Sequence, residues 1–332
     1  MVRKGTRTPW PQLGAPEDAQ GLTRLAEHYL TMLQVRGCTE ATLRSRRSQL
    51  TPFLQWCELR NLQRADVITK PMLERYQRYL FYYRRKNGKP LTVGAQVNRL
   101  RAVRTLFRWL VRSGYLVTNP ASDLEMPRMP QRLPKAVLSA DEAEKVLALP
   151  DVSTPMGLRD RAMLETLYST GIRRAELGHL KVWDVDAERG TLTVREGKGR
   201  KDRMVPAGAR ALSWIARYVS EARPQLVTCR DDGTLFVNQL GEPFDLVYLS
   251  HRVRHYVDAA KLGKSGACHL FRHTMATAML ENGADIRHIQ AMLGHASIST
   301  TQIYTRVSMR LLKEIHAATH PASLASADES SS

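Results

Sequence analysis

The chain has 332 residues, of which 43% are hydrophobic and 25% are charged, and its formal net charge is +18. That length is enough for two ordinary domains, and the composition is typical of a globular protein, so neither a disordered chain nor a membrane protein is expected. The four cysteines lack the spacing of a disulfide framework or a metal site, and no apolar N-terminal signal precedes the first domain, which favours a cytoplasmic protein.

The positive charge is concentrated in the N-terminal part of the chain. Residues 1–135 hold 25 Lys and Arg against 9 Asp and Glu, a net charge of +16, whereas residues 136–332 hold 25 against 23, a net charge of +2. So uneven a distribution predicts a polyanionic partner for the N-terminal part. The alternative is a solvated surface that serves only solubility.

This basic part is predicted to be an irregular arm followed by helices. Prolines and a glycine within residues 1–18 favour the arm, and residues 19–118 are expected to form an all-α binding domain. Its helices are predicted from amphipathic patterns over residues 22–36, 40–60, 71–85 and 92–112.

Arginines follow two of these helices. In the helix over 92–112 they form a stripe opposite the apolar face, with no acidic residue one turn away to neutralise them. A solubilising surface is the alternative for such a stripe. The arginines expected to contact the polyanion are Arg44, Arg46 and Arg47 in the second helix and Arg101, Arg104, Arg108 and Arg112 in the fourth.

Prolines separate this domain from a second one. Four of them predict an extended linker over residues 119–136, and a second domain is expected over 137–318, followed by a disordered tail over 319–332. The elements predicted in the second domain are helices over 139–149, 157–169, 207–222, 245–261, 269–281 and 285–293, and strands over 191–195, 203–206 and 235–237.

The stretch from His269 to Tyr304 concentrates polar side chains that can react. His269 and Arg272 are three residues apart, so they share one face of a helix. Gly294 ends the following helix and leaves His295 in a turn, and Tyr304 falls in the second turn of a further helix. Neither a zinc-binding spacing nor an H-E-x-x-H motif is present, so no metal is expected.

The order His-x-x-Arg, Gly-His and a tyrosine nine residues later resembles the active-site half of the tyrosine recombinases, the phage integrase family. The phrases Leu-Gly-His and Ser-Thr-Thr-Gln-Ile-Tyr are most similar to its Xer branch. The resemblance implies two upstream motifs. Residues 170–177 are similar to the family's first arginine box, which makes Arg173 the catalytic arginine and Glu176 its acidic neighbour, and residues 196–201 are similar to its lysine hairpin, which makes Lys198 the catalytic lysine.

The resemblance also implies fold and function. The fold is expected to be mainly α with a small antiparallel β-sheet, as an all-α core-binding domain plus a mixed α+β catalytic domain. The function is expected to be site-specific recombination of double-stranded DNA through a 3′-phosphotyrosyl intermediate, without a cofactor, by a homo-tetramer or hetero-tetramer on two DNA sites. A type IB topoisomerase and a DNA-binding protein without catalysis remain alternatives.

The reacting groups fit that chemistry. Two guanidiniums, Arg173 and Arg272, suit the charge of a phosphodiester and its transition state. A neutral phenol at Tyr304 needs a base, for which His269 is the candidate, and the leaving 5′-oxygen needs a proton, for which Lys198 is the candidate. His295 is expected to bind a non-bridging oxygen, whereas His273 and Arg174 are expected to be structural.

Overall fold

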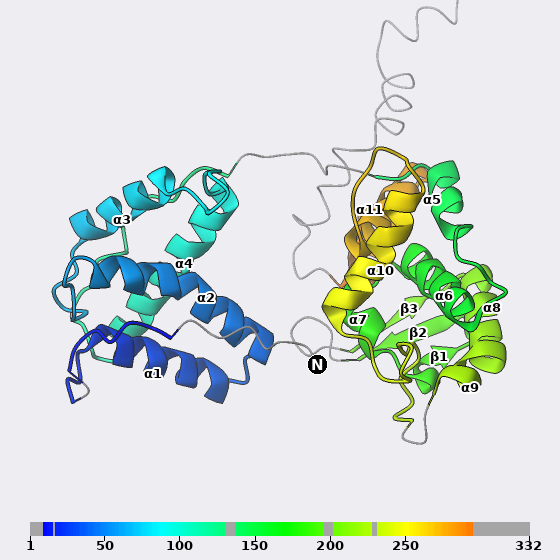
Figure 1. Cartoon of the computed structure of the whole chain (residues 1–332), viewed down its shortest axis with the longest axis horizontal. Helices are drawn as coiled ribbons and strands as arrows, with labels where there is room; N and C mark the ends of the chain where they lie inside the picture. Colours follow the sequence, from blue (N-terminus) through cyan, green and yellow to red (C-terminus); the bar gives the residue numbers. More distant parts are fainter. Residues whose placement is uncertain (1–8, 16, 130–136, 196–201, 228–230, 295–332) are drawn as a thin grey trace, which may run out of the picture. The chain divides into compact units, whose positions relative to one another are not determined.

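The computed structural model describes residues 9–15, 17–129, 137–195, 202–227 and 231–294. The chain divides into two compact units, Met1–Gln131 and Arg132–Ser332, which we call the N-terminal unit and the C-terminal unit (Figure 1). The described residues are mainly helical and contain one small antiparallel sheet, so the predicted fold class is confirmed. Among them, no helix is both long and apolar enough to cross a membrane.

In the described part of the N-terminal unit, four helices surround a hydrophobic core: α1 Leu22–Val35, α2 Glu40–Glu58, α3 Lys70–Tyr82 and α4 Val93–Arg112. Threonine side chains cap the N-termini of α2 and α4. The Thr39 hydroxyl accepts a hydrogen bond from the backbone N–H of Thr42, and the Thr92 hydroxyl accepts one from the backbone N–H of Ala95. The helices begin and end close to their predicted bounds. The exception is α3, which stops three residues before the expected end at residue 85 because the chain turns back into a bridge between Arg84 and Pro90.

Residues near the start of the chain belong to this core. Trp10 and Leu13 are 5% and 3% exposed, and the Trp10 indole donates to Thr51 Oγ1 at 2.9 Å. Residues 9–13 were expected to be part of an irregular arm, and they form neither helix nor strand. Their apolar side chains nevertheless pack into the core of the N-terminal unit.

The C-terminal unit combines helices with a three-stranded sheet in the order β1-β2-β3, formed by Val185–Asp186, Thr191–Val194 and Arg203–Pro206. Leu192 pairs with Val205, and both are buried. Its helices are α5 Ala140–Leu147, α6 Pro155–Thr170, α7 Arg174–His179, α8 Ala209–Arg217, α9 Arg223–Leu226, α10 Leu246–Ala259, α11 Cys268–Glu281 and α12 Ile286–Leu293, with a 3-10 turn at Val182–Asp184 and a π-helical turn at Tyr218–Ala222.

Helix α6 lies in the interior of this unit and packs against α5, α8 and α11 (Figure 1). It carries a fully buried ion pair, Arg159 with Asp160 at 2.7 Å. The second Asp160 oxygen accepts from Arg252 Nε at 2.6 Å and from the Tyr256 hydroxyl at 2.7 Å, both on α10. One buried carboxylate thereby joins α6 to α10, a network that the sequence did not reveal.

The strand predicted over residues 235–237 is wrong. Thr234 and Val237 take part only in isolated bridges, and the segment bends between them. Arginine side chains bind its carbonyls: Arg223 donates to the carbonyl oxygen of Thr234 at 2.7 Å, and Arg159 donates to that of Val237 at 3.0 Å. The backbone is satisfied in this way, so a neighbouring strand is not needed.

Candidate active site

A left-handed turn after α6 places Arg173. Gly171 has φ +59°, a left-handed conformation that strains other residues, and a Cβ atom there would also displace the Met275 methyl group, 2.2 Å away. The chain then enters α7, with Arg173 as the residue before its first turn. The Arg173 side chain is thereby fixed at the junction of two helices.

Glu176 holds Arg173 at this junction. Its carboxylate accepts from the Arg173 backbone N–H at 2.7 Å and from Arg173 Nη1 at 2.7 Å. Burial alone raises the pKa of Glu176, but the hydrogen bonds from Arg203 and Arg173 outweigh burial and lower the pKa to about 2. Glu176 is therefore ionised at any pH at which the protein works.

Arg203, the first residue of β3, is the second partner of that carboxylate. Its Nη1 and Nη2 atoms donate to Glu176 Oε1 and Oε2 at 3.0 and 2.8 Å, the forked geometry that suits a guanidinium and a carboxylate. One buried carboxylate thus lies between two guanidiniums. Sequence reasoning missed Arg203 as a site residue.

Arg272 reaches the same place from α11. It is 3% exposed, and it donates from Nη1 to the Gly171 carbonyl and from Nη2 to the Leu293 carbonyl, both at 2.7 Å. These bonds join the turn that precedes Arg173 to the end of α12.

Three arginines therefore bind three successive carbonyls at the end of α12. Arg203 Nε donates to Met292 at 3.1 Å, Arg272 Nη2 to Leu293 at 2.7 Å, and Arg173 Nη2 to Gly294 at 2.8 Å. The last carbonyls of a helix have no partners within the helix and carry partial negative charge, so cations are favoured there. The arrangement fixes the residue that directly precedes His295 in the sequence.

His269 lies on α11, one turn before Arg272, and its side chain is only partly shielded from solvent. Partial burial and the nearby charges of Arg272, Arg174 and Arg173 lower its pKa below the ordinary value of 6.5. The imidazole is therefore neutral at neutral pH and can accept a proton. Arg174 itself donates to Ser250 Oγ at 3.0 Å and so joins α7 to α10.

Three of the predicted catalytic residues, Lys198, His295 and Tyr304, lie outside the described residues. So do residues 309–315, for which Leu311, Leu312 and Ile315 predict an amphipathic helix. Of the catalytic candidates that the structure describes, Arg173 and Arg272 both donate to carbonyls at the end of α12, and His269 lies one turn before Arg272 on α11. In the described part of the chain, no group of three or more His, Cys, Asp and Glu side chains could hold a metal ion.

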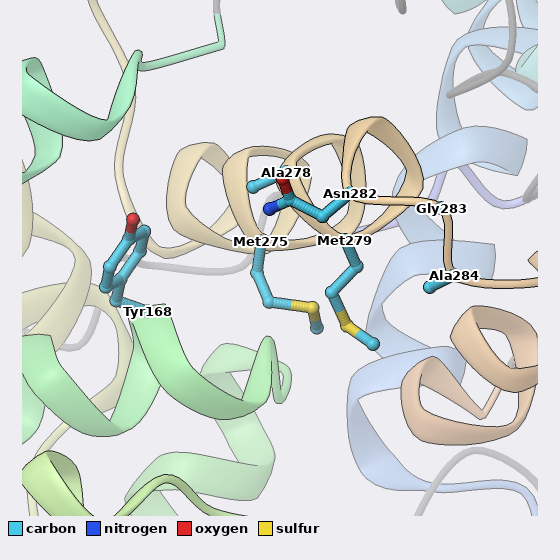
Figure 2. Close-up of a pocket in the computed structure, with 7 residues that line it drawn as sticks. All are labelled: Tyr168, Met275, Ala278, Met279, Asn282, Gly283 and Ala284. Atoms are coloured by element: carbon cyan, nitrogen blue, oxygen red, sulfur yellow. The ribbon is translucent and has the colours of Figure 1, made fainter. Parts of the chain in front are cut away.

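A pocket of about 420 Å³ lies between the end of α6 and the second half of α11. Figure 2 shows Met275 and Met279 extending from α11, with Tyr168 from the end of α6 facing them. Met275 also packs against Gly171, whose carbonyl binds Arg272. Met275 therefore both lines the pocket and packs against the turn that binds Arg272.

The arginines predicted to contact the polyanion differ in their exposure and in their contacts. Arg44 and Arg47 line a groove of about 500 Å³ together with Arg99 of α4, and the Arg47 guanidinium lies 4.4 Å from the centre of the Trp10 ring. Arg46 faces another way: it is half-buried and donates to Thr105 Oγ1 at 3.4 Å.

The stripe on α4 is divided in the same manner. Arg101, Arg108 and Arg112 are exposed. Arg104 is half-buried, because its Nη2 atom donates to the Ser122 carbonyl at 2.9 Å in the segment that follows the helix. Three of the four predicted contacts are therefore open to a ligand, and the fourth joins α4 to the next segment.

Comparison with known proteins places these features in a family. The model of the phage integrase family matches residues 136–310. Tyrosine recombinase XerC 2 of Ralstonia nicotianae is 52% identical over 303 residues, covering 91% of this chain and 87% of that protein. XerD of Vibrio cholerae is 37% identical over 303 residues, covering 90% and 96%. Among solved structures, a post-cleavage complex of the XerH site-specific recombinase with palindromic difH substrate has a TM-score of 0.69 at 24% identity, covering 88% of this chain and 83% of that one, and thus has the same fold.

Proposed function

Because this chain belongs to the phage integrase family, as a site-specific DNA recombinase of its Xer-like branch, we propose that Arg173 and Arg272 clamp the phosphate at which a strand is cut. The observation that carries this proposal is their convergence on the Gly294 and Leu293 carbonyls, directly before His295. The order of the groups along the chain supports it: Lys198 lies between Arg173 and Arg272, and Tyr304 follows His295.

The clamp acts on charge. A phosphodiester carries negative charge on its non-bridging oxygens and gains more in the pentacoordinate transition state, which guanidiniums stabilise through paired hydrogen bonds. Arg173 uses two of its five N–H donors on Glu176 and Gly294, which orients the fork and leaves donors for a phosphate. Donors placed where charge develops are each worth about 3 to 4 kcal/mol.

Proton transfers complete the scheme. Tyr304 attacks phosphorus, so that an Oη–P bond forms and the P–O5′ bond breaks. A phenol with a pKa near 10 is only about 0.1% ionised at neutral pH, so His269 takes its proton. Lys198 gives a proton to the leaving 5′-oxygen, and His295 donates to a non-bridging oxygen. The 3′-phosphotyrosyl link retains the bond energy, and attack by the 5′-hydroxyl of another strand reverses the step without a cofactor.

The basic N-terminal unit supplies affinity for a specific duplex site. We assign phosphate contacts to Arg44 and Arg47, which line the groove, and to Arg101, Arg108 and Arg112, which are exposed on α4. Arg46 and Arg104 are proposed to support the same surface from behind, since each is half-buried and bonded within the unit.

Assembly and location follow from the reaction. Exchange between two duplexes needs four strands cut in a coordinated way, which a homo-tetramer or hetero-tetramer provides, and the apolar side chains of segment 309–315 suit a contact between protomers. We place the protein in the cytoplasm, on the nucleoid or a plasmid, where its substrate is. Deletion from Met309 onward is expected to spare binding to one site and to abolish pairing of two sites; full recombination by the truncated protein contradicts this role.

The function is tested on supercoiled plasmids that carry two, one or no copies of a site selected by the protein from a randomised duplex library. A recombinase resolves only the plasmid with two sites in direct repeat. Relaxation of the plasmid without a site, with no resolution of the two-site plasmid, identifies a topoisomerase instead. Binding without any change of topology identifies a DNA-binding protein without catalysis.

A further inference from the structure

Arg203 is the one arginine at the end of α12 to which the proposed clamp gives no role. It binds both oxygens of Glu176, which holds Arg173. It also binds the Met292 carbonyl, two residues before the Gly294 carbonyl that Arg173 binds. A Cβ atom on Gly294 would lie 3.1 Å from the Arg203 guanidinium, so this side chain also fills the space beneath the last turn of α12.

The charges of the group give these contacts a consequence. Arg173 and Glu176 alone form a neutral pair, in which the carboxylate 2.7 Å from Nη1 cancels much of the field that Arg173 offers to a phosphate. Arg203 pairs with the same carboxylate at 2.8 Å and brings the net charge of the three groups to +1. The carboxylate can then orient Arg173 without cancelling its charge.

We propose that Arg203 is a positioning residue for strand cleavage: by neutralising and fixing Glu176, it keeps the Arg173 guanidinium in place and available to the scissile phosphate. This inference rests on the proposed role of Arg173 in the clamp. It also gives β3 a function in the reaction, because this strand carries the positive charge that neutralises Glu176.

The test compares cleavage of two DNA substrates by full-length variants. A nicked suicide duplex is made with a native phosphate or with a methylphosphonate at the cleavage position, where a methyl group replaces one non-bridging oxygen and removes the negative charge. Arg203→Met keeps the length of an apolar stem and removes the charge. The control Arg210→Met also breaks a bond to a buried glutamate, Glu165 on α6, which Arg173 does not share.

On the native phosphate, Arg203→Met is expected to slow single-turnover cleavage roughly tenfold to hundredfold, up to the loss for a direct donor. On the methylphosphonate the loss should shrink to less than about threefold, because little charge remains to be stabilised. Arg203→Lys retains a cation but not the fork, so its loss on the native phosphate should be smaller than that of Arg203→Met. Arg210→Met should cleave both substrates at rates close to the native protein.

Several outcomes overturn the inference. One is an equal loss on both substrates for Arg203→Met, which is what a general defect of folding produces. If Arg203→Met does not fold, an Arg203→Lys variant that is equally slow on both substrates has the same meaning. Arg173→Met separates this inference from the clamp itself: if its own defect is not relieved on the methylphosphonate, the clamp role is wrong. Relief for Arg173→Met without relief for the Arg203 variants refutes only the role of Arg203.

Discussion

Replacing Glu176 by glutamine is the perturbation whose cost follows most directly from the geometry. The Glu176 side chain is 5% exposed and accepts four hydrogen bonds, two from Arg173 and two from Arg203. Glutamine has nearly the same shape, but its amide nitrogen is a donor that faces donors, and its charge is gone. Two guanidiniums then lie side by side without a counter-ion.

The pKa gives the magnitude. A lowering from 4.5 to about 2 corresponds to about 3 kcal/mol of stability that depends on the charged carboxylate. Because the folded-state pKa is depressed, this contribution is fully present above pH 4.5 and is lost as the pH falls toward 2. Glutamine does not titrate, so the difference between native and variant protein should stay constant from neutral pH to about pH 5 and shrink below about pH 4.5.

Hydrogen exchange followed by mass spectrometry can measure this difference in stability for the C-terminal unit alone, separately from the N-terminal unit. Peptides from α7 and α12 should lose about 3 kcal/mol of protection in Glu176→Gln at neutral pH. The control is Glu144→Gln, which breaks a pair with Arg210 whose two side chains are each 47% exposed, and it should cost less than about 1 kcal/mol. A difference for Glu176→Gln that is below about 1 kcal/mol, or that does not change with pH, refutes the reasoning.

Three further predictions concern the base, the interior and the DNA-binding surface. Since the pKa of His269 is lowered, single-turnover cleavage should decline on acidification with a midpoint below pH 6.5, and His269→Asn should lose this limb; a native midpoint at or above 6.5 contradicts the role. Asp160→Asn leaves the buried Arg159 without its counter-ion and should cost about 3 to 5 kcal/mol, seen as lost exchange protection in α6; a loss below about 1 kcal/mol excludes a structural part for the network. Replacement of Arg101, Arg108 or Arg112 by alanine should each lower the slope of log affinity against log salt by about 0.9, and Arg104→Ala by less; an unchanged slope in the triple variant shows that the stripe faces solvent.

The helices were predictable because their signals are local. The Ser139 and Glu142 capping box opens α5 as expected, and Gly294 ends α12 in the left-handed conformation with φ +60°. The two strands next to the lysine hairpin were predicted from short strand signals on either side of its Gly-Lys-Gly turn, and they pair with each other in an antiparallel way.

The errors arise where tertiary contacts decide. The apolar residues 235–237 suggest a strand, but arginines from α9 and α6 bind the carbonyls of Thr234 and Val237 in its place. Arg104 and Arg108 are equivalent in sequence, yet only Arg104 meets the carbonyl of Ser122. No local pattern predicts that contact, because it depends on the path of the chain beyond the helix.

The candidate site shows the same limit. Motif order predicted Arg173, Glu176, His269 and Arg272, but Arg203 belongs to none of the motifs that were found. Its importance comes from Glu176, 27 residues away, and from Met292, 89 residues away. The one signal in the sequence is Glu176 itself: a buried acid needs positively charged partners, and each arginine of the domain is a candidate partner.

The proposed recombinase cuts DNA by forming a covalent bond between the DNA and Tyr304. The direct measurement is to trap the intermediate on a nicked site whose short 5′-hydroxyl fragment diffuses away, digest it with protease, and identify the DNA-linked peptide by mass spectrometry. The linkage is expected to form in EDTA without nucleotide and to map to Tyr304, and Tyr304→Phe is expected to bind the site normally but to form no adduct. An adduct at another residue, an adduct formed by Tyr304→Phe, or a requirement for magnesium in the cleavage step contradicts this mechanism.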